Sequence, residues 1–134
     1  MFRLTLPLPP RLRLALVVPL NALLLAACQG DCTGVAGDGI QVTVIDAATE
    51  RPITGFATVT ISDGDYVEVL KLDVFVPDQR LYVGAHERMG TYDVHVEVPG
   101  YESQSRSQVK VTRERKCGVI MPNRFTVALV PEPA

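Results

Sequence analysis

The sequence contains no tryptophan, and aromatic residues make up only 6% of its 134 residues. A core built around several large aromatic rings is therefore excluded, and valine, isoleucine and leucine must supply most of the buried apolar surface. Such a core is small, and a small domain buries a smaller fraction of its surface on folding than a large one does. A covalent link between distant parts of the chain would therefore be useful to its stability.

Acidic residues are absent before Asp31, whereas Arg3, Arg11 and Arg13 all lie in that part of the chain. The remainder carries ten of the thirteen Lys and Arg and all fifteen Asp and Glu, which gives it a formal charge near −5. Nucleic-acid phosphates require clustered Lys and Arg, so this balance argues against a nucleic-acid partner.

No stretch after residue 30 approaches the ~20 apolar residues that a membrane-spanning helix needs. Before it, a basic segment at 1–13 is followed by an apolar run at 14–27. As a helix this run would measure roughly 21 Å, which is shorter than the ~30 Å hydrocarbon core of a bilayer. The pattern is typical of an export signal, so residues 1–27 are expected to be a signal peptide that is removed.

The leader ends in Leu25-Ala26-Ala27-Cys28, which resembles the lipobox of bacterial lipoproteins. The resemblance implies a diacylglyceryl group on the Cys28 sulfur, cleavage before Cys28 and acylation of the new N-terminus, for instance with palmitate. Two or more acyl chains hold a protein stably on a bilayer. The expected location is the cell membrane or outer membrane, exposed to the periplasm or cell surface. The alternative is an ordinary signal peptide that leaves Cys28 as a free thiol.

If Cys28 carries lipid, Cys32 and Cys117 are the two cysteines that remain. Thiols pair in the oxidising compartments that exported proteins reach, and two cysteines allow only one intramolecular pairing. We therefore expect a disulfide that joins positions 85 residues apart and closes nearly the whole domain. Two free thiols or an intermolecular pair are the alternatives. Neither cysteine has a CxxC partner, so a zinc site is not expected.

Apolar and polar residues alternate from Ile40 onward, which predicts β-strands rather than helices. The expected strands are 40–44, 57–61, 66–72 with 74–76, 81–84, 91–98, 108–112 and 124–130. About seven strands separated by polar turns predict an all-β fold, an antiparallel seven-stranded β-sandwich over residues 40–130. Residues 28–39 are expected to form a lipidated flexible tether, and residues 131–134 a short tail.

Two stretches of the alternating region carry recognisable patterns: residues 40–61, IQVTVIDAATERPITGFATVTI, and residues 90–101, GTYDVHVEVPGY. Both resemble carboxypeptidase regulatory-like domains, which have a transthyretin-like (prealbumin-like) sandwich. The positions that match the family's pattern are Asp46, Thr49, Pro52, Ile53, Gly90, Tyr92, Val94, Val96, Gly100 and Tyr101. Glu50 stands where the family usually has glycine. The resemblance implies an accessory or binding module without catalysis of its own.

Common catalytic motifs are absent: the chain has no G-x-S-x-G, no P-loop and no G-x-G-x-x-G. The sharpest local group is Asp93, His95 and Glu97, whose alternate positions on one strand lie roughly 6.6–7 Å apart. Three such side chains could hold a cation or share a proton. However, side chains on a flat strand run parallel, and antiparallel sheets normally have a polar outer face. We therefore expect no catalytic residue and no cofactor, and these three remain the candidate metal ligands.

These features predict a non-enzymatic, membrane-anchored lipoprotein whose β-sandwich serves as a binding or structural module with a protein or glycan partner. A first alternative is a small envelope hydrolase or metal-dependent enzyme that uses the face of Asp93, His95 and Glu97. A second is a subunit of a larger envelope assembly that recognises its partner through an exposed strand edge.

Overall fold

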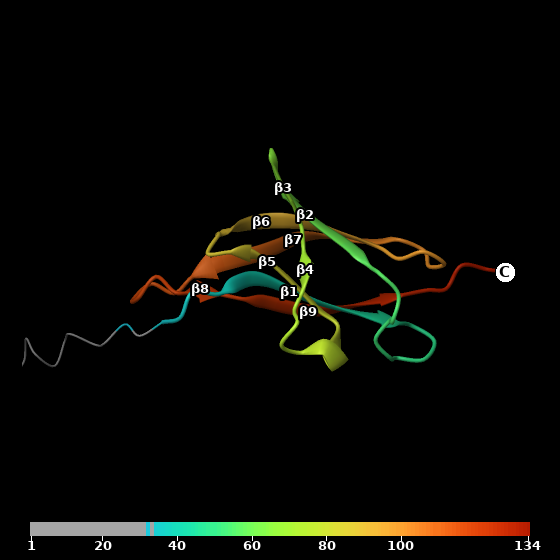
Figure 1. Cartoon of the computed structure of the whole chain (residues 1–134). Helices are drawn as coiled ribbons and strands as arrows, with labels where there is room; N and C mark the ends of the chain where they lie inside the picture. The colour runs from blue at the N-terminus through green and yellow to red at the C-terminus, as the bar shows by residue number, and fades with distance from the viewer. Residues whose placement is uncertain (1–31, 33) are drawn as a thin grey trace, which may run out of the picture. The chain divides into compact units, whose positions relative to one another are not determined.

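The computed structural model of this chain describes Cys32 and residues 34–134, and the fold within them is almost entirely β (Figure 1). The strands are β1 (Asp38–Asp46), β2 (Thr58–Asp63), β3 (Tyr66–Val69), β4 (Lys71–Leu72), β5 (Leu81–His86), β6 (Gly90–Glu97), β7 (Gln104–Arg113), β8 (Ile120–Met121) and β9 (Asn123–Leu129). A 3-10 helix, η2 (Pro77–Gln79), precedes β5. The expected signal peptide and Cys28 lie outside these residues. In the described part, no helix is long and apolar enough to cross a membrane.

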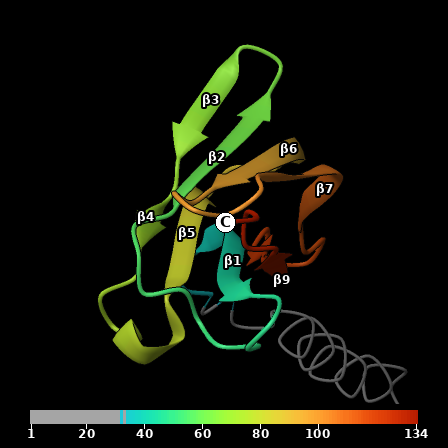
Figure 2. The same ribbon diagram turned by 90° about the vertical axis from the view of Figure 1, so that its right-hand side faces the viewer.

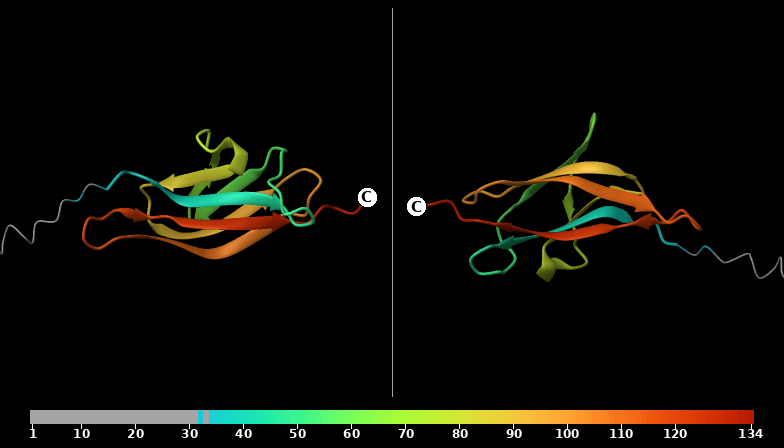
Figure 3. Two further views of the ribbon diagram at one scale, coloured as in Figure 1. Left: turned by 90° about the horizontal axis from the view of Figure 1, so that it is seen from below. Right: turned by 180° about the vertical axis from the view of Figure 1, so that it is seen from behind.

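The strands form two sheets that lie one over the other, as the views from below and from behind show (Figure 3). The first, called here the β1 sheet, has the order β4-β5-β1-β9, and the second, the β6 sheet, has the order β3-β2-β6-β7-β8. This arrangement confirms an all-β fold of two packed sheets, although the nine strands include two of only two residues.

One strand pair departs from the expected antiparallel sandwich. β1 and β9 run parallel, in register from Ile40↔Asn123 to Asp46↔Leu129, whereas the other pairs within the described residues are antiparallel. β7 ends near the start of β1, and the chain crosses there through β8 into β9. It therefore enters the β1 sheet in the same direction as β1, which excludes an antiparallel pairing.

The core lies between the sheets and is aliphatic, as the composition predicts. β6 and its neighbour β2 bury their alternate residues on the face that looks toward the β1 sheet. On this face Val59 lies opposite Val96 and Ile61 lies opposite Val94. Of the fully buried side chains in the described part, Tyr92 is the largest. The buried core residues are Ile40, Val42, Val44, Ile53, Val59, Ile61, Leu70, Leu81, Tyr82, Ala85, Tyr92, Val94, Val96, Val98, Val109, Val111, Ile120 and Leu129.

Residues 66–72 do not form the single strand that was predicted. β3 pairs with β2 in one sheet, whereas β4 pairs with β5 in the other. Leu70 lies between them and is only 5% exposed, so the chain crosses between the sheets by placing this side chain in the core. A Cβ at Gly84 would lie 2.1 Å from Leu70 Cδ2, so a larger residue there would force the Leu70 side chain to move.

Residues 74–76, also predicted as strand, form a turn. The backbone N–H of Phe75 donates to Asp73 Oδ1 at 2.9 Å, and Pro77 begins η2. An aspartate that bonds the backbone two residues ahead favours a turn, and proline has no N–H to give to a β-ladder. These local interactions outweigh the β-propensity of Val74 and Phe75.

The Asp63-Gly64 turn confirms the hairpin that its sequence predicts. Gly64 has φ +60°, the left-handed conformation that two-residue hairpin turns require. It joins β2 to β3, and Figure 2 shows this hairpin extending beyond the other strands. The hairpin places the short edge strand β3 at one margin of the β6 sheet.

Cys32 and Cys117 are joined by a disulfide, as predicted. Cys117 lies in the turn between β7 and β8, which is closed by hydrogen bonds from Glu114 N to Val119 O and from Gly118 N to Glu114 O, of 2.8 and 2.9 Å. The bond therefore links the segment before β1 to a turn late in the sequence.

Candidate functional site

Of the predicted group Asp93, His95 and Glu97 on β6, the structure brings only His95 and Glu97 into contact. On the outer face of the β6 sheet, His95 Nε2 lies 2.9 Å from Glu97 Oε1, and His95 Nδ1 lies 2.7 Å from Ser105 Oγ of β7. Asp93 makes no side-chain hydrogen bond or ion pair within the described residues. The histidine thus connects a carboxylate and a hydroxyl, and the aspartate stays apart.

Ser105 was missed by the sequence reasoning because a bulge changes the register of β7. Tyr92 faces Val109 across the strand pair, yet Val94 faces Arg106, so β7 has one extra residue between these pairs. Gln108 has φ +59° at this point. Such a bulge exchanges the faces of all residues on one side of it. Ser105 consequently joins His95 outside, and Arg106 turns toward the space between the sheets.

Ser105, His95 and Glu97, called here the histidine group, are hydrogen-bonded in the order of a proton relay, but they lie on an open face and not in a cleft. A neutral imidazole that donates from Nε2 to Glu97 would accept at Nδ1 from the Ser105 hydroxyl. The His95 and Glu97 side chains are, however, 44% and 62% exposed on an open face. Within the described part of the chain, no group of three or more His, Cys, Asp or Glu side chains could hold a metal ion.

A second candidate site is the seam where the free edges of the two sheets meet, formed by residues 104–110 of β7 and by β9. β9 is the last strand of the β1 sheet. β8 covers β7 only at Thr112 and Arg113, so residues 104–110 of β7 are also an edge. We call this region the β7–β9 seam.

The β7–β9 seam is closed at both ends and open in the middle. At one end Asn123 Nδ2 donates to the carbonyl of Lys110 at 3.1 Å. At the other, Glu102 N donates to the carbonyl of Val130 at 2.9 Å, next to a bridge between Tyr101 and Pro131. Between these links a slot about six residues long remains.

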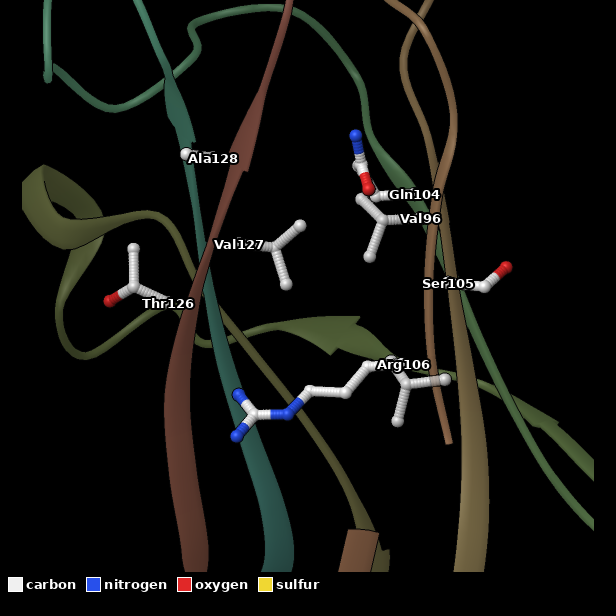
Figure 4. A pocket seen from close by; sticks show the side chains of 8 residues that line it. Val96, Gln104, Ser105, Arg106, Thr126, Val127 and Ala128 are labelled. Carbon is white, nitrogen blue, oxygen red and sulfur yellow. The ribbon is translucent and has the colours of Figure 1, made fainter. Parts of the chain in front are cut away.

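A hollow of about 240 Å³ opens in this slot. Its lining residues are Val94, Val96, Gln104, Ser105, Arg106, Thr126, Val127 and Ala128. Figure 4 shows Val96 and Val127 facing the hollow from opposite sides, whereas the Ser105 side chain points away from it. The histidine group and the hollow are therefore separate sites on opposite faces of the β6 sheet.

Arg106 crosses the slot. Its guanidinium carbon lies 4.5 Å from the centre of the Phe125 ring on β9, a cation–π contact that connects the two sheets. Arg124, also on β9, donates from Nε to Gln41 Oε1 at 2.7 Å. Neither guanidinium has a carboxylate partner among the described residues. The slot thus combines an apolar floor with the charge of Arg106, and Arg124 adds a second positive charge on the outer face of β9.

Asp46 and Tyr101, two of the positions named in the sequence comparison above, form a third group, whose role is structural. Asp46 Oδ1 accepts from the backbone N–H groups of Ala48 and Thr49 at 2.7 and 3.1 Å, the usual way in which an aspartate stabilises a turn. Asp46 Oδ2 accepts from the Tyr101 hydroxyl at 2.7 Å. Glu50 has φ +58°, the left-handed conformation that glycine adopts most readily.

These hydrogen bonds hold the pKa of Asp46 below its usual value, chiefly through the Tyr101 hydroxyl and then through the amides of Thr49 and Ala48. A lowered pKa means that the carboxylate stabilises the fold above its unfolded pKa of about 3.9, and that this contribution is lost as the pH falls through the folded pKa. The same hydrogen bond raises the pKa of Tyr101. The contact joins the turn after β1 to the turn after β6.

We therefore expect the Tyr101→Phe variant to raise the pKa of Asp46 toward its usual value. The measurement is the pH titration of the Asp46 side-chain carbonyl chemical shift in both proteins. Unfolding by urea should also show that the stability difference between the natural chain and Asp46→Asn is present at pH 7 and shrinks at pH 3. An Asp46 carboxyl that titrates at the same pH with and without the tyrosine hydroxyl would contradict this account.

No protein-family model and no curated protein sequence matches this chain. Of the sites described, the β7–β9 seam alone combines a hollow, free strand edges and unneutralised charge, a combination suited to holding an extended chain.

Proposed function

We propose that this chain is a membrane-anchored lipoprotein in which a β-sandwich of the carboxypeptidase regulatory-like, transthyretin-like type serves as a non-catalytic binding or structural module of the cell envelope. Its place is the cell membrane or the outer membrane, exposed to the periplasm or the cell surface. The anchor is lipid on Cys28, and the partner is a protein or a glycan.

The observation that carries the proposal is the order of the three cysteines. Cys28 closes a lipobox-like sequence, and Cys32, four residues later, is disulfide-bonded to Cys117. Disulfides persist in compartments outside the reducing cytosol. A disulfide therefore agrees with export, which the leader at 1–27 also predicts. The two-sheet fold fits a module that binds through its edges and loops.

A small envelope hydrolase is the second candidate, and the hydrogen-bonded order of Ser105, His95 and Glu97 favours it. A serine hydrolase also needs a cleft and oxyanion donors near its nucleophile. The Ser105 side chain points away from the hollow (Figure 4). We therefore place the binding module first. Hydrolysis of a nitrophenyl ester that the Ser105→Ala variant loses would reverse this order.

The lipid anchor is tested by labelling cells with an alkynyl fatty acid. We expect the natural chain to take up label and to sediment with membranes, because two or more acyl chains hold a protein stably on a bilayer. The Cys28→Ser variant should lose the label completely and leave the membrane-anchored fraction. The Cys32→Ser variant is the matched control, since it removes a neighbouring sulfur and should keep its label. Label on Cys28→Ser, or an unlabelled natural chain, would refute the anchor.

A further inference from the structure

We propose that the β7–β9 seam binds an extended, acidic segment of another envelope protein. In this complex the segment pairs with the free edge of β9, places an aliphatic side chain in the hollow and brings a carboxylate to Arg106. The inference rests on the proposed function in that the partner is taken to be an envelope protein, while the binding chemistry stands on the seam itself.

The free edge of β9 is the first argument. β9 has seven residues, whereas the edge strands β3, β4 and β8 of the described part have four, two and two. The free stretch of β7, residues 104–110, is as long as β9 but is interrupted by the bulge near Gln108. Proteins commonly protect edges by keeping them short or by adding charges and proline. The sequence of β9, NRFTVAL, has no proline and one charge. Such an edge is suited to the addition of a strand.

The hollow supplies a place for a side chain. The side chains of an extended strand point alternately to its two faces. A segment along β9 would therefore direct every second residue toward the space between the sheets, where Val94, Val96 and Val127 line the hollow. The six residues between the closed ends of the seam correspond to ~20 Å of strand. An aliphatic residue that enters the hollow would fix the register of the added strand.

The positive charges of Arg106 and Arg124 favour a bound segment that contains carboxylates. Arg106 lies at the rim of the hollow and Arg124 on the outer face of β9, and neither has a carboxylate partner in the part of the chain that the structure describes. Guanidinium groups pair with carboxylates through two parallel hydrogen bonds, which gives both affinity and orientation. The domain as a whole is acidic, so an acidic segment would be repelled elsewhere and attracted at the seam.

A second role for Arg106 is protection of the free edge, and the experiment below distinguishes it from carboxylate binding. A charge that points inward near an edge can protect that edge from unwanted pairing. If Arg106 is protective, its removal should favour strand addition. If it binds a carboxylate, its removal should weaken strand addition. The two roles therefore predict opposite results for the same substitution.

The test is a calorimetric titration of the full-length chain, purified from membranes in detergent, with an acetylated and amidated heptapeptide of sequence SVDDSVS. Its two Val and its second Asp share the face toward the space between the sheets, where Arg106 lies, and its first Asp lies on the other face, as Arg124 does. We expect saturable one-to-one binding that slows hydrogen exchange at the amides of β9. The control peptide SVKKSVS reverses the charge, and the control peptide SSVVDDS has the same composition with its Val on opposite faces, so both should bind at least tenfold more weakly.

The Arg106→Gln and Arg124→Gln variants should each weaken binding of the SVDDSVS peptide, Arg106→Gln by at least tenfold. Arg115→Gln removes the same charge from an exposed turn outside the seam and should bind as the natural chain does. Three results would overturn the proposal: no saturable binding at millimolar peptide, equal binding of the Lys peptide, or undiminished binding by Arg106→Gln. Because this titration does not depend on the lipid, its result is independent of whether Cys28 is labelled in cells.

Discussion

Replacing both Cys32 and Cys117 by alanine should lower the free energy of unfolding by about 4 kcal/mol. The disulfide links positions 85 residues apart, and a crosslink of that span removes much of the conformational entropy of the unfolded chain. For a domain of about 100 residues the loss corresponds to a melting temperature roughly 15 °C lower or more. Since domains of this size are stable by about 5–15 kcal/mol, the loss is a large part of the total.

Urea unfolding of the natural chain and of the double variant measures this difference. A reducing agent should destabilise the natural chain by a similar amount and leave the double variant unchanged, which separates the crosslink from the packing of the two sulfur atoms. Cys28→Ser is the control for loss of a cysteine outside the bond. A destabilisation below about 1 kcal/mol would contradict the role given to the disulfide.

Truncation of Tyr92 to alanine is expected to cost about 4 kcal/mol, the usual range for a large buried aromatic side chain. Tyr92 is fully buried on β6. Its hydroxyl accepts from Arg88 Nη1 at 2.8 Å and donates to the Arg88 carbonyl at 3.0 Å. The ring fills the core and the hydroxyl binds the loop before β6, so the side chain joins the packing of the sheets to the geometry of that loop.

Two further variants serve as comparisons, one for the hydroxyl alone and one for an exposed ring. Tyr92→Phe keeps the ring and removes only the hydroxyl, so its cost should be about 1 kcal/mol. Phe56→Ala removes an aromatic ring that is 90% exposed and should change stability by less than about 0.5 kcal/mol. Chemical unfolding of the three variants supplies the comparison. The core described above would be wrong if Tyr92→Ala were no more destabilised than Phe56→Ala.

The sequence predicted the strands best where one face is buried and the other solvated. In β6 the buried residues Tyr92, Val94 and Val96 alternate with exposed or partly exposed residues, and the period of two is visible without any knowledge of the neighbours. The Asp63-Gly64 hairpin was predictable for a similar reason, since its turn depends on the conformational freedom of a single glycine.

Predictions were less accurate where local propensity and tertiary contacts disagree. Val74 and Phe75 favour a strand by residue type, but Asp73 and Pro77 make the segment a turn. Leu70 interrupts an otherwise regular alternation because its side chain enters the core while the chain passes between sheets. Neither outcome follows from periodicity, which does not specify the sheet to which a residue belongs.

The sequence by itself determined the class of fold and the face that each regular strand buries, because alternation is a local fact. It predicted the disulfide only on the premise that Cys28 carries lipid, and the structure shows the bond between Cys32 and Cys117. The tertiary structure alone decided the candidate binding site. Alternation from Val109 and Val111 would place Ser105 inside and Arg106 outside, but the extra residue near Gln108 reverses both. The pairing of β7 with β6 fixes that register, and pairing between distant strands is not encoded in the pattern of either strand alone.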